Sequence, residues 1–266
     1  MNWLEALILG LLQGLTEFLP VSSSGHLAIA QYLFEVDAEQ NLVFAILVHF
    51  ATVLATICVF YKEIGRLFKG LFQFKWNFET KYVVLLLISA IPVAVVAVFF
   101  KNEVESLFTS GLWIIACALL LTALLLTLSH FITKYYEKSD KKSKTINFLN
   151  AFIIGISQAI AIIPGLSRSG TTISTGLMLG MKREEVAKFS FLMVIIPIVG
   201  EAMLDILGGG FVSSGINILP MIVGFVAAFV SGLLACKFML AIVKKAKLWW
   251  FSIYCIIAAT VAFIFS

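Results

Sequence analysis

Long apolar stretches without charged residues dominate the hydrophobicity pattern of this 266-residue chain. The longest of them run from Tyr82 to Phe100, Gly111 to Thr133, Ile206 to Cys236 and Leu248 to Ser266. A helix needs about 20 residues to cross a hydrocarbon core of ~30 Å. Each run therefore predicts a membrane span, and the pattern as a whole predicts an all-α integral membrane protein.

The pattern divides into six full spans and two pairs of shorter helices. The spans are expected at about 41–61, 82–100, 111–133, 185–206, 217–237 and 249–265. The short pairs are expected at about 2–18 with 23–34 and about 148–163 with 169–180. Pro20 and Pro164, with glycines nearby, interrupt these pairs. Each pair is too short to cross twice and is predicted to form a re-entrant helical hairpin.

The two predicted hairpins look like copies of each other at a spacing of 145 positions. Identical residues occur at Ala6/Ala151, Ile8/Ile153, Gly10/Gly155, Gln13/Gln158, Ser22/Ser167, Ser24/Ser169 and Gly25/Gly170. Each half has three full spans, and an odd number places the second copy upside down relative to the first. The sequence thus predicts one membrane domain, 1–266, with inverted repeat halves 1–133 and 147–266 joined by a basic loop at 134–146.

Charge sets the expected orientation. All lysines and arginines except Lys101 and Arg168 fall on one predicted side of the membrane. The positive-inside rule makes that side cytoplasmic, with the loop 134–146 on it. The first hairpin then enters from outside and the second from the cytoplasm, so that their tips can meet. The net charge of +4 gives no indication of nucleic-acid binding.

Arg168 is the first residue that predicts chemistry. An arginine in apolar membrane sequence costs at least ~2.5–3.5 kcal/mol, and guanidinium matches phosphate oxygens. The residues around Arg168 lie at the expected start of a helix, where binding of an anion is favoured. They are Ser167, Ser169, Gly170 and Thr172. The segment predicts a phosphate-binding site. The alternative is an ion pair of Arg168 with Glu17 or Glu201.

The first hairpin carries a second polar group. Gln13 and Glu17, four residues apart, share one helix face, where the carboxylate is a candidate base, cation ligand or partner of Arg168. The following segment is Pro20-Val-Ser22-Ser23-Ser24-Gly25-His26. Its hydroxyls are candidate nucleophiles or phosphate donors, and His26 is a candidate general acid or base. His49, in the middle of a span, is interpreted as a packing residue.

These two motifs resemble those of the undecaprenyl-diphosphate phosphatases, the bacitracin-resistance family of integral membrane enzymes. The matching segments are the Gln13-to-Glu17 helix with Pro20-Val-Ser-Ser-x-Gly-His26, and Pro164-Gly-x-Ser-Arg-Ser-Gly-x-Thr172. Length, span count and internal duplication also match, so the resemblance covers essentially the whole chain. The first acidic position of the family pattern is Gln13 here, which leaves Glu17 as the only carboxylate of the motif.

The resemblance implies hydrolysis of undecaprenyl diphosphate to undecaprenyl phosphate and phosphate, which recycles the lipid carrier of peptidoglycan synthesis and confers bacitracin resistance. It also implies a divalent cation, Mg²⁺ or Ca²⁺, held by Glu17 and Gln13, and a catalytic face on the extracytoplasmic side of the bacterial inner membrane. Arg168, with Ser22, Ser24, Ser167, Ser169, Gly170 and Thr172, is expected to bind the diphosphate. His26 is the expected acid or base. Ser23 and a water activated by His26 both remain open as the nucleophile.

Two further readings stay open. Inverted repeats with broken helices are typical of secondary transporters, so a transporter or lipid flippase with an anion site at the repeat interface is the alternative function. The expected partners are a polyprenyl diphosphate lipid and the bilayer, and the sequence leaves a homodimer undecided. Phosphate release from a lipid diphosphate separates the enzyme from the transporter.

Overall fold

The computed structural model describes residues 1–34, 38–108, 111–138, 144–207, 217–245 and 248–266, and every regular element in those ranges is an α-helix. The first half contains α1 (Trp3–Phe18), α2 (Ser23–Leu33), α3 (Ala38–Val59), α4 (Tyr61–Leu71), α5 (Phe78–Phe99), α6 (Lys101–Phe108) and α7 (Leu112–Lys138). The second contains α8 (Phe148–Ile160), α9 (Arg168–Met178), α10 (Arg183–Met193), α11 (Ile195–Leu207), α13 (Ile218–Lys245) and α14 (Trp249–Ile264).

The four helices predicted for the two hairpins are confirmed. Residues at corresponding positions of the two repeats cap their N-termini. Asn2 caps the start of α1, and Asn147 caps the start of α8 in the same way. The Ser22 hydroxyl accepts a hydrogen bond from the Gly25 N–H at 3.1 Å, and the Ser167 hydroxyl accepts one from Gly170 at 3.1 Å. A capping oxygen satisfies an N–H group that the first turn leaves free. The two halves therefore use the same local signals to begin the same helices.

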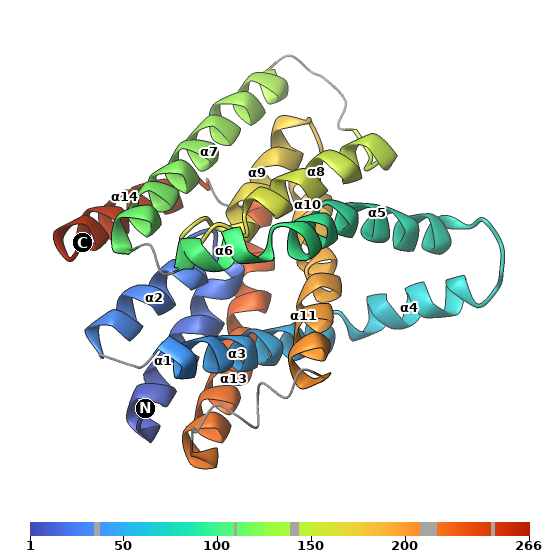
Figure 1. Cartoon of the computed structure of the whole chain (residues 1–266). Helices are drawn as coiled ribbons and strands as arrows, with labels where there is room; N and C mark the ends of the chain where they lie inside the picture. Colours follow the sequence, from blue (N-terminus) through green and yellow to red (C-terminus); the bar gives the residue numbers. More distant parts are fainter. Residues whose placement is uncertain (35–37, 109–110, 139–143, 208–216, 246–247) are drawn as a thin grey trace.

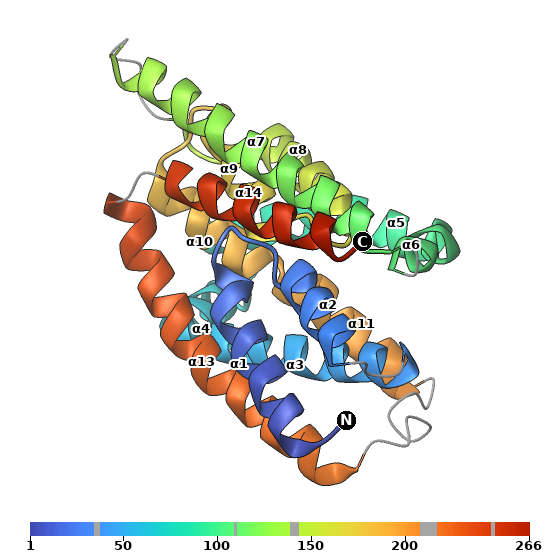
Figure 2. The ribbon, with the colours of Figure 1, turned by 90° about the vertical axis from the view of Figure 1, so that its left-hand side faces the viewer.

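The first helix of each hairpin packs against a long helix of the other half. α1 lies along α13, α8 lies along α5, and α7 lies beside α14 (Figures 1 and 2). Gly10 and Gly155 permit these approaches, because a Cβ at Gly10 would meet the Gly224 carbonyl and one at Gly155 would meet Ser89. The same repeat position thus provides close packing twice.

Gly10→Ala is expected to destabilise the protein by about 1–3 kcal/mol, because the added methyl group forces α1 away from the backbone of α13. Thermal unfolding in detergent would measure the loss. Gly65→Ala is the control, since Gly65 is also helical and has nothing within 4 Å of an added Cβ. Equal stability of the two variants would contradict the close packing.

The predicted fourth span, 185–206, is wrong as one continuous helix. It divides at Val194 into α10 and α11. Pro197 explains the break, because it donates no N–H and its ring collides with the carbonyl of Met193, four residues earlier. Among the described helices, three are long and apolar enough to span a membrane: Phe78–Phe99, Leu112–Tyr136 and Ile218–Val243. A fourth candidate span is the pair Val43–Val59 and Tyr61–Leu71, whose two helices are bent by 76° relative to each other.

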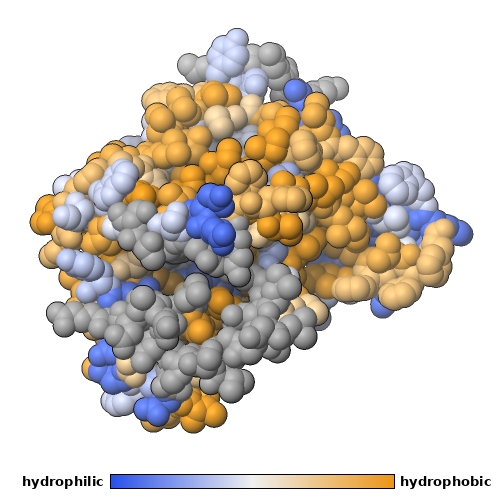
Figure 3. Space-filling view, viewed as in Figure 1, coloured by the Kyte–Doolittle hydropathy of each residue, from blue (hydrophilic) through white to orange (hydrophobic). Residues whose placement is uncertain are grey.

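Two helices were missed. The predicted cytoplasmic loop 62–81 contains α4, and the predicted loop 101–110 contains α6. The charged residues of α4 suggested a loop in the sequence. In the structure α4 is an amphipathic helix, and these charges lie on one of its faces. Apolar side chains cover most of the face shown in Figure 3, as expected for a multi-pass membrane protein.

Several expectations lie outside the described residues. They concern parts of the segments between the predicted helices 23–34 and 41–61 and between the predicted spans 185–206 and 217–237, the middle of the joining loop 134–146, and the side chain of Glu201. The ion pair between Arg168 and Glu201 is among them.

Candidate active site

Glu17 lies at the centre of the polar cluster, near the end of α1. Its side chain is 5% exposed. One carboxylate oxygen, Oε2, accepts hydrogen bonds from Gln13 Nε2 at 2.6 Å and from the Ser23 hydroxyl at 2.7 Å. The other oxygen, Oε1, pairs with the Arg168 guanidinium. Three of the predicted site residues therefore meet on one buried carboxylate.

Arg168 reaches Glu17 from the other half of the chain. It is the first residue of α9, so the positive end of that helix lies beside its backbone. The ion pair with Glu17, one of the two predicted alternatives, is present. It does not exclude phosphate binding, because a guanidinium carries five N–H donors. The pair joins the hairpins and leaves the site close to neutral.

The hairpin tips touch, as predicted. The Ser24 hydroxyl accepts a hydrogen bond from the Gly165 N–H at 3.3 Å, and the Ser169 hydroxyl donates one to the Leu19 carbonyl at 3.0 Å. Gly165 has φ +87°, where a side chain would be strained, and a Cβ on Gly25 would approach the Gly165 Cα at 3.2 Å. Tight tip packing thus holds Glu17 against Arg168.

The remaining predicted phosphate-binding hydroxyls have partners within the protein. Ser22 and Ser167 cap α2 and α9, and Ser167 N–H also donates to the Thr122 hydroxyl at 3.0 Å. Thr172 shares a hydrogen bond of 2.6 Å with Ser190 and is fully buried. Gly170 lies under Ser167 and Thr122, where a Cβ would find contacts of 3.0–3.2 Å. These residues position the tip segments, whereas Ser23 and Arg168 contact Glu17 directly.

Ser167→Ala is expected to cost about 1 kcal/mol of stability, because the Gly170 N–H loses its cap. Ser167→Asn, which restores a capping side chain, is expected to recover most of the loss. Thermal unfolding of both variants would measure it, and an unchanged midpoint for Ser167→Ala would rule out the capping role.

The His26 side chain is directed toward Tyr254 and does not contact Glu17. Its Nδ1 lies 2.7 Å from the Ser22 carbonyl, which only accepts, so Nδ1 carries the proton. Its Nε2 lies 2.7 Å from the Tyr254 hydroxyl on α14, and the two rings stack at 5.5 Å. Neither contact reaches Glu17. Sequence gave no signal for Tyr254.

His49 was interpreted as a packing residue, and the structure places it at the site. Its Nδ1 lies 2.8 Å from the Ala45 carbonyl, while its Nε2 lies 3.6 Å from Glu17 Oε2. A histidine in the middle of an apolar span is itself a functional signal, because ionisable groups in membranes are costly. The interpretation of His49 as a packing residue does not account for its contact with Glu17.

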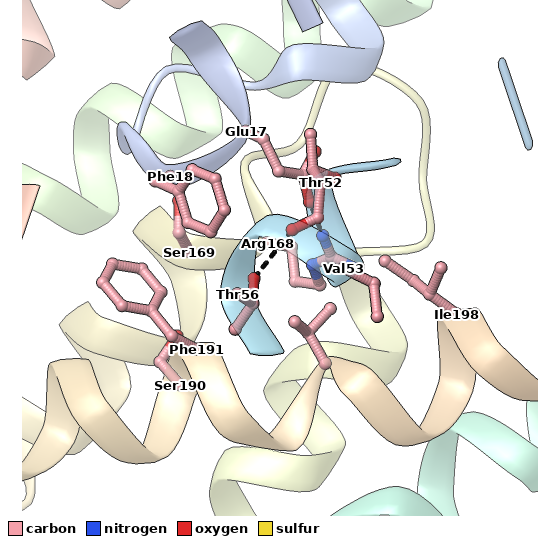
Figure 4. A pocket seen from close by; sticks show the side chains of 11 residues that line it. Glu17, Phe18, Thr52, Val53, Thr56, Arg168, Ser169, Ser190, Phe191 and Ile198 are labelled. Atoms are coloured by element: carbon pink, nitrogen blue, oxygen red, sulfur yellow. Dashed lines mark hydrogen bonds and ion pairs between the residues drawn. The ribbon is translucent and has the colours of Figure 1, made fainter. Parts of the chain in front are cut away.

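A small cavity opens beside the Glu17 and Arg168 pair (Figure 4). Its polar lining consists of Glu17, Thr52, Thr56, Arg168, Ser169 and Ser190. These residues come from α1, α3, α9 and α10, so the cavity lies where both halves meet. The cavity lining thus combines the arginine and the carboxylate of the ion pair with four hydroxyl groups.

The site contains few ligands for a divalent cation. Glu17 supplies one carboxylate, already shared with Arg168, and Gln13 supplies Oε1, which is buried and has no hydrogen-bond partner among the described residues. Hard cations take six or more oxygen ligands. Glu17 and Gln13 can therefore coordinate a cation only together with phosphate oxygens that supply its remaining ligands.

The fold and site define a multi-pass helical membrane protein with a polar cluster, centred on Glu17, where two pairs of short helices meet. The chain matches the family described as bacitracin resistance protein BacA over residues 6–261. The chain therefore belongs to this family. It is 58% identical to a protein of Bacteroides thetaiotaomicron over 261 residues, with 97% of each chain covered, and that relative is named undecaprenyl-diphosphatase.

Other relatives carry the same name. One from Bacteroides fragilis is 56% identical over 269 residues, which cover 100% of this chain and 99% of that protein. One from Methanobrevibacter smithii is 36% identical over 276 residues, which cover 99% and 97%.

Proposed function

We propose that this protein hydrolyses undecaprenyl diphosphate to undecaprenyl phosphate and inorganic phosphate. Its family and the shared name of full-length relatives support this reaction. The observation that carries it is the buried Glu17 carboxylate, which accepts the Ser23 hydroxyl on one oxygen and pairs with the Arg168 guanidinium through the other. Cleavage of a diphosphate needs a positioned nucleophile and positive charge on the transferred phosphoryl group, and these two contacts supply both.

Ser23 is the nucleophile that the geometry favours. Its hydroxyl donates to Glu17 Oε2 at 2.7 Å, so the carboxylate is in place to take the proton. The Ser23 oxygen bonds to the terminal phosphorus, the bridging P–O bond breaks, and the electron pair leaves on undecaprenyl phosphate. Water then cleaves the phosphoserine, which releases inorganic phosphate and returns the proton to Ser23.

Arg168 stabilises the transferred phosphoryl group. Its guanidinium pairs with Glu17 and carries five N–H donors, whose planar arrangement matches phosphate oxygens. The N-terminus of α9 adds the positive end of a helix dipole. When Glu17 takes the proton of Ser23, its charge falls, and Arg168 becomes available to the phosphate.

His26 serves the second step in this proposal. It lies on α2 three residues after Ser23, on a neighbouring face of the helix, and its Nε2 contacts Tyr254 in the resting structure. A turn of the side chain away from Tyr254 would free Nε2 to activate the water that cleaves the phosphoserine. The direct attack by a His26-activated water remains the second mechanism.

Glu17 and Gln13 Oε1 would hold a divalent cation, Mg²⁺ or Ca²⁺, together with diphosphate oxygens. When bound, the cation would neutralise phosphate charge. Chelator is then expected to abolish phosphate release, and added Mg²⁺ or Ca²⁺ to restore it.

The membrane arrangement is also part of the proposal. The two hairpins are re-entrant, the halves 1–133 and 147–266 are inverted repeats, and the site opens to the extracytoplasmic side of the inner membrane. The exchange of partners between halves, α1 with α13 and α8 with α5, supports an inverted repeat.

The test is phosphate release from undecaprenyl diphosphate by the purified protein, with Arg168→Ala as the matched inactive variant. Release by the wild type and a loss of at least about 100-fold in the variant are expected, since one charge-stabilising donor is worth that much. No release by the wild type, with lipid transfer across proteoliposomes instead, would replace the enzyme by a transporter or flippase.

A further inference from the structure

The turn between α4 and α5 presents three aromatic side chains outward. Phe72, Phe74 and Trp76 are 69%, 91% and 68% exposed, and Figure 1 shows the turn projecting from the rest of the molecule. Phe74 has φ +51°, a left-handed conformation that is strained for a bulky residue. Water offers these rings no favourable contact that would offset the strain and the exposure. The turn therefore fits an apolar surface outside the protein.

Asn77 holds this turn in place. Its Nδ2 donates hydrogen bonds to the Gly70 carbonyl at 3.0 Å and to Gln73 Oε1 at 3.3 Å. Its Oδ1 accepts the Thr80 N–H at 2.8 Å, which caps the start of α5. The outward rings thus belong to a hydrogen-bonded turn, which we call the aromatic turn, residues 72–76.

The opposite side of α4 is held by the protein. Leu67 is buried in the main core cluster, and Ile64 packs against that cluster. Glu63 pairs with Lys188 of α10. These contacts fix the rotation of α4 about its axis. Phe68, which is 57% exposed, therefore points away from the core, one helical turn before the aromatic turn begins.

Positive charge is in excess around the aromatic turn. Lys69 and Lys75 are exposed, and neither forms an ion pair with another described residue. The nearby carboxylates of Glu63 and Glu79 lie 2.9 and 3.7 Å from the Arg66 guanidinium. The two lysines are therefore available to an anion from outside the protein.

The bilayer surface is the environment that the fold places beside the aromatic turn. α5 is a candidate membrane span that begins at Phe78, two residues after Trp76. The aromatic turn therefore lies at the boundary between hydrocarbon and water. Aromatic rings are favoured at this depth, and each lysine near an anionic bilayer surface strengthens binding about fivefold.

We propose that the aromatic turn, with Phe68 and Lys69 of α4, binds anionic phospholipid at the surface of the membrane. The aromatic rings lie among the upper acyl carbons, and the ammonium groups of Lys69 and Lys75 bind the lipid phosphates. This site uses none of the residues around Glu17, so it does not depend on the proposed phosphatase reaction.

Fluorescence of Trp76 tests this site in vesicles that contain the full-length protein. The probe is brominated phosphatidylglycerol or brominated phosphatidylcholine, added as a minor component to phosphatidylcholine vesicles. The difference between the wild type and Trp76→Phe isolates the Trp76 signal. Quenching of that signal is expected with both lipids, and it should be at least about fivefold greater per mole with the anionic lipid.

Lys69→Gln with Lys75→Gln, measured with and without Trp76→Phe, tests the role of the lysines. This double change is expected to abolish the preference for phosphatidylglycerol and to leave quenching by phosphatidylcholine in place. Lys134→Gln with Lys237→Gln is the matched control, because these lysines are also exposed but lie on α7 and α13. The control is expected to keep the preference, and thermal unfolding verifies that each variant is folded.

Three results would overturn the proposal. No quenching of Trp76 by either lipid would place the aromatic turn outside the bilayer and would favour a partner protein as its occupant. Equal quenching by the two lipids would exclude selective binding of anionic lipid. A preference that survives in Lys69→Gln with Lys75→Gln would show that these lysines do not bind the lipid phosphates.

Discussion

Glu17→Gln is expected to reduce phosphate release from undecaprenyl diphosphate by about 10³-fold or more. The amide has nearly the shape of the carboxylate, but it cannot take the proton of Ser23, whose hydroxyl lies 2.7 Å from Glu17 Oε2. It also removes the charge that orients Arg168. Loss of a general base and loss of orientation both lower kcat, so the effect should appear mainly in kcat.

The same variant is expected to lose about 3 kcal/mol of stability, because the mostly buried charge of Arg168 loses the carboxylate of Glu17. Glu17→Gln with Arg168→Gln should lose less than the sum of the two single changes. Glu5→Gln is the control on α1, since Glu5 contacts only the Asn2 cap in the described contacts. Activity of Glu17→Gln within about 10-fold of the wild type would exclude Glu17 as the base.

Ser23→Ala is expected to lower kcat by a comparable factor of about 10³, because it removes the attacking oxygen and leaves Glu17 in place. Ser24→Ala is the matched control. Ser24 is the next residue, but its hydroxyl accepts from the Gly165 N–H, so its loss should cost stability more than catalysis.

Acid quenching with substrate labelled on the terminal phosphate distinguishes the two open nucleophiles. Labelled phosphoserine in the wild type and none in Ser23→Ala would establish attack by Ser23. Unlabelled protein, together with Ser23→Ala activity within about 5-fold of the wild type, would show attack by a water that His26 activates.

Much of the hairpin architecture could be predicted because its signals are local. A capping side chain acts within three residues, as Ser22 and Ser167 do. The duplicated spacing also marked the paired positions Gly10 and Gly155, which both support close packing. Less was predictable where local signals conflicted, as at Pro197, which divides an apolar run long enough for one span.

The candidate site was predicted in its residues but only partly in its contacts. The sequence marked Gln13, Glu17, Ser23 and Arg168, because polar groups in apolar membrane sequence are costly. It did not mark Tyr254, and it assigned His49 to packing. Both lie on helices far along the chain from their partners, so their roles depend on how those helices pack.

The sequence by itself determined the helices of both hairpins, their caps and the membrane character of the chain, because these depend on neighbouring residues and on hydrophobic length. Only the tertiary structure decided that Arg168 pairs with Glu17, that His26 turns toward Tyr254, and that His49 lies beside Glu17. Those contacts join residues up to 228 positions apart. They follow from the packing of helices against one another, which no local pattern specifies.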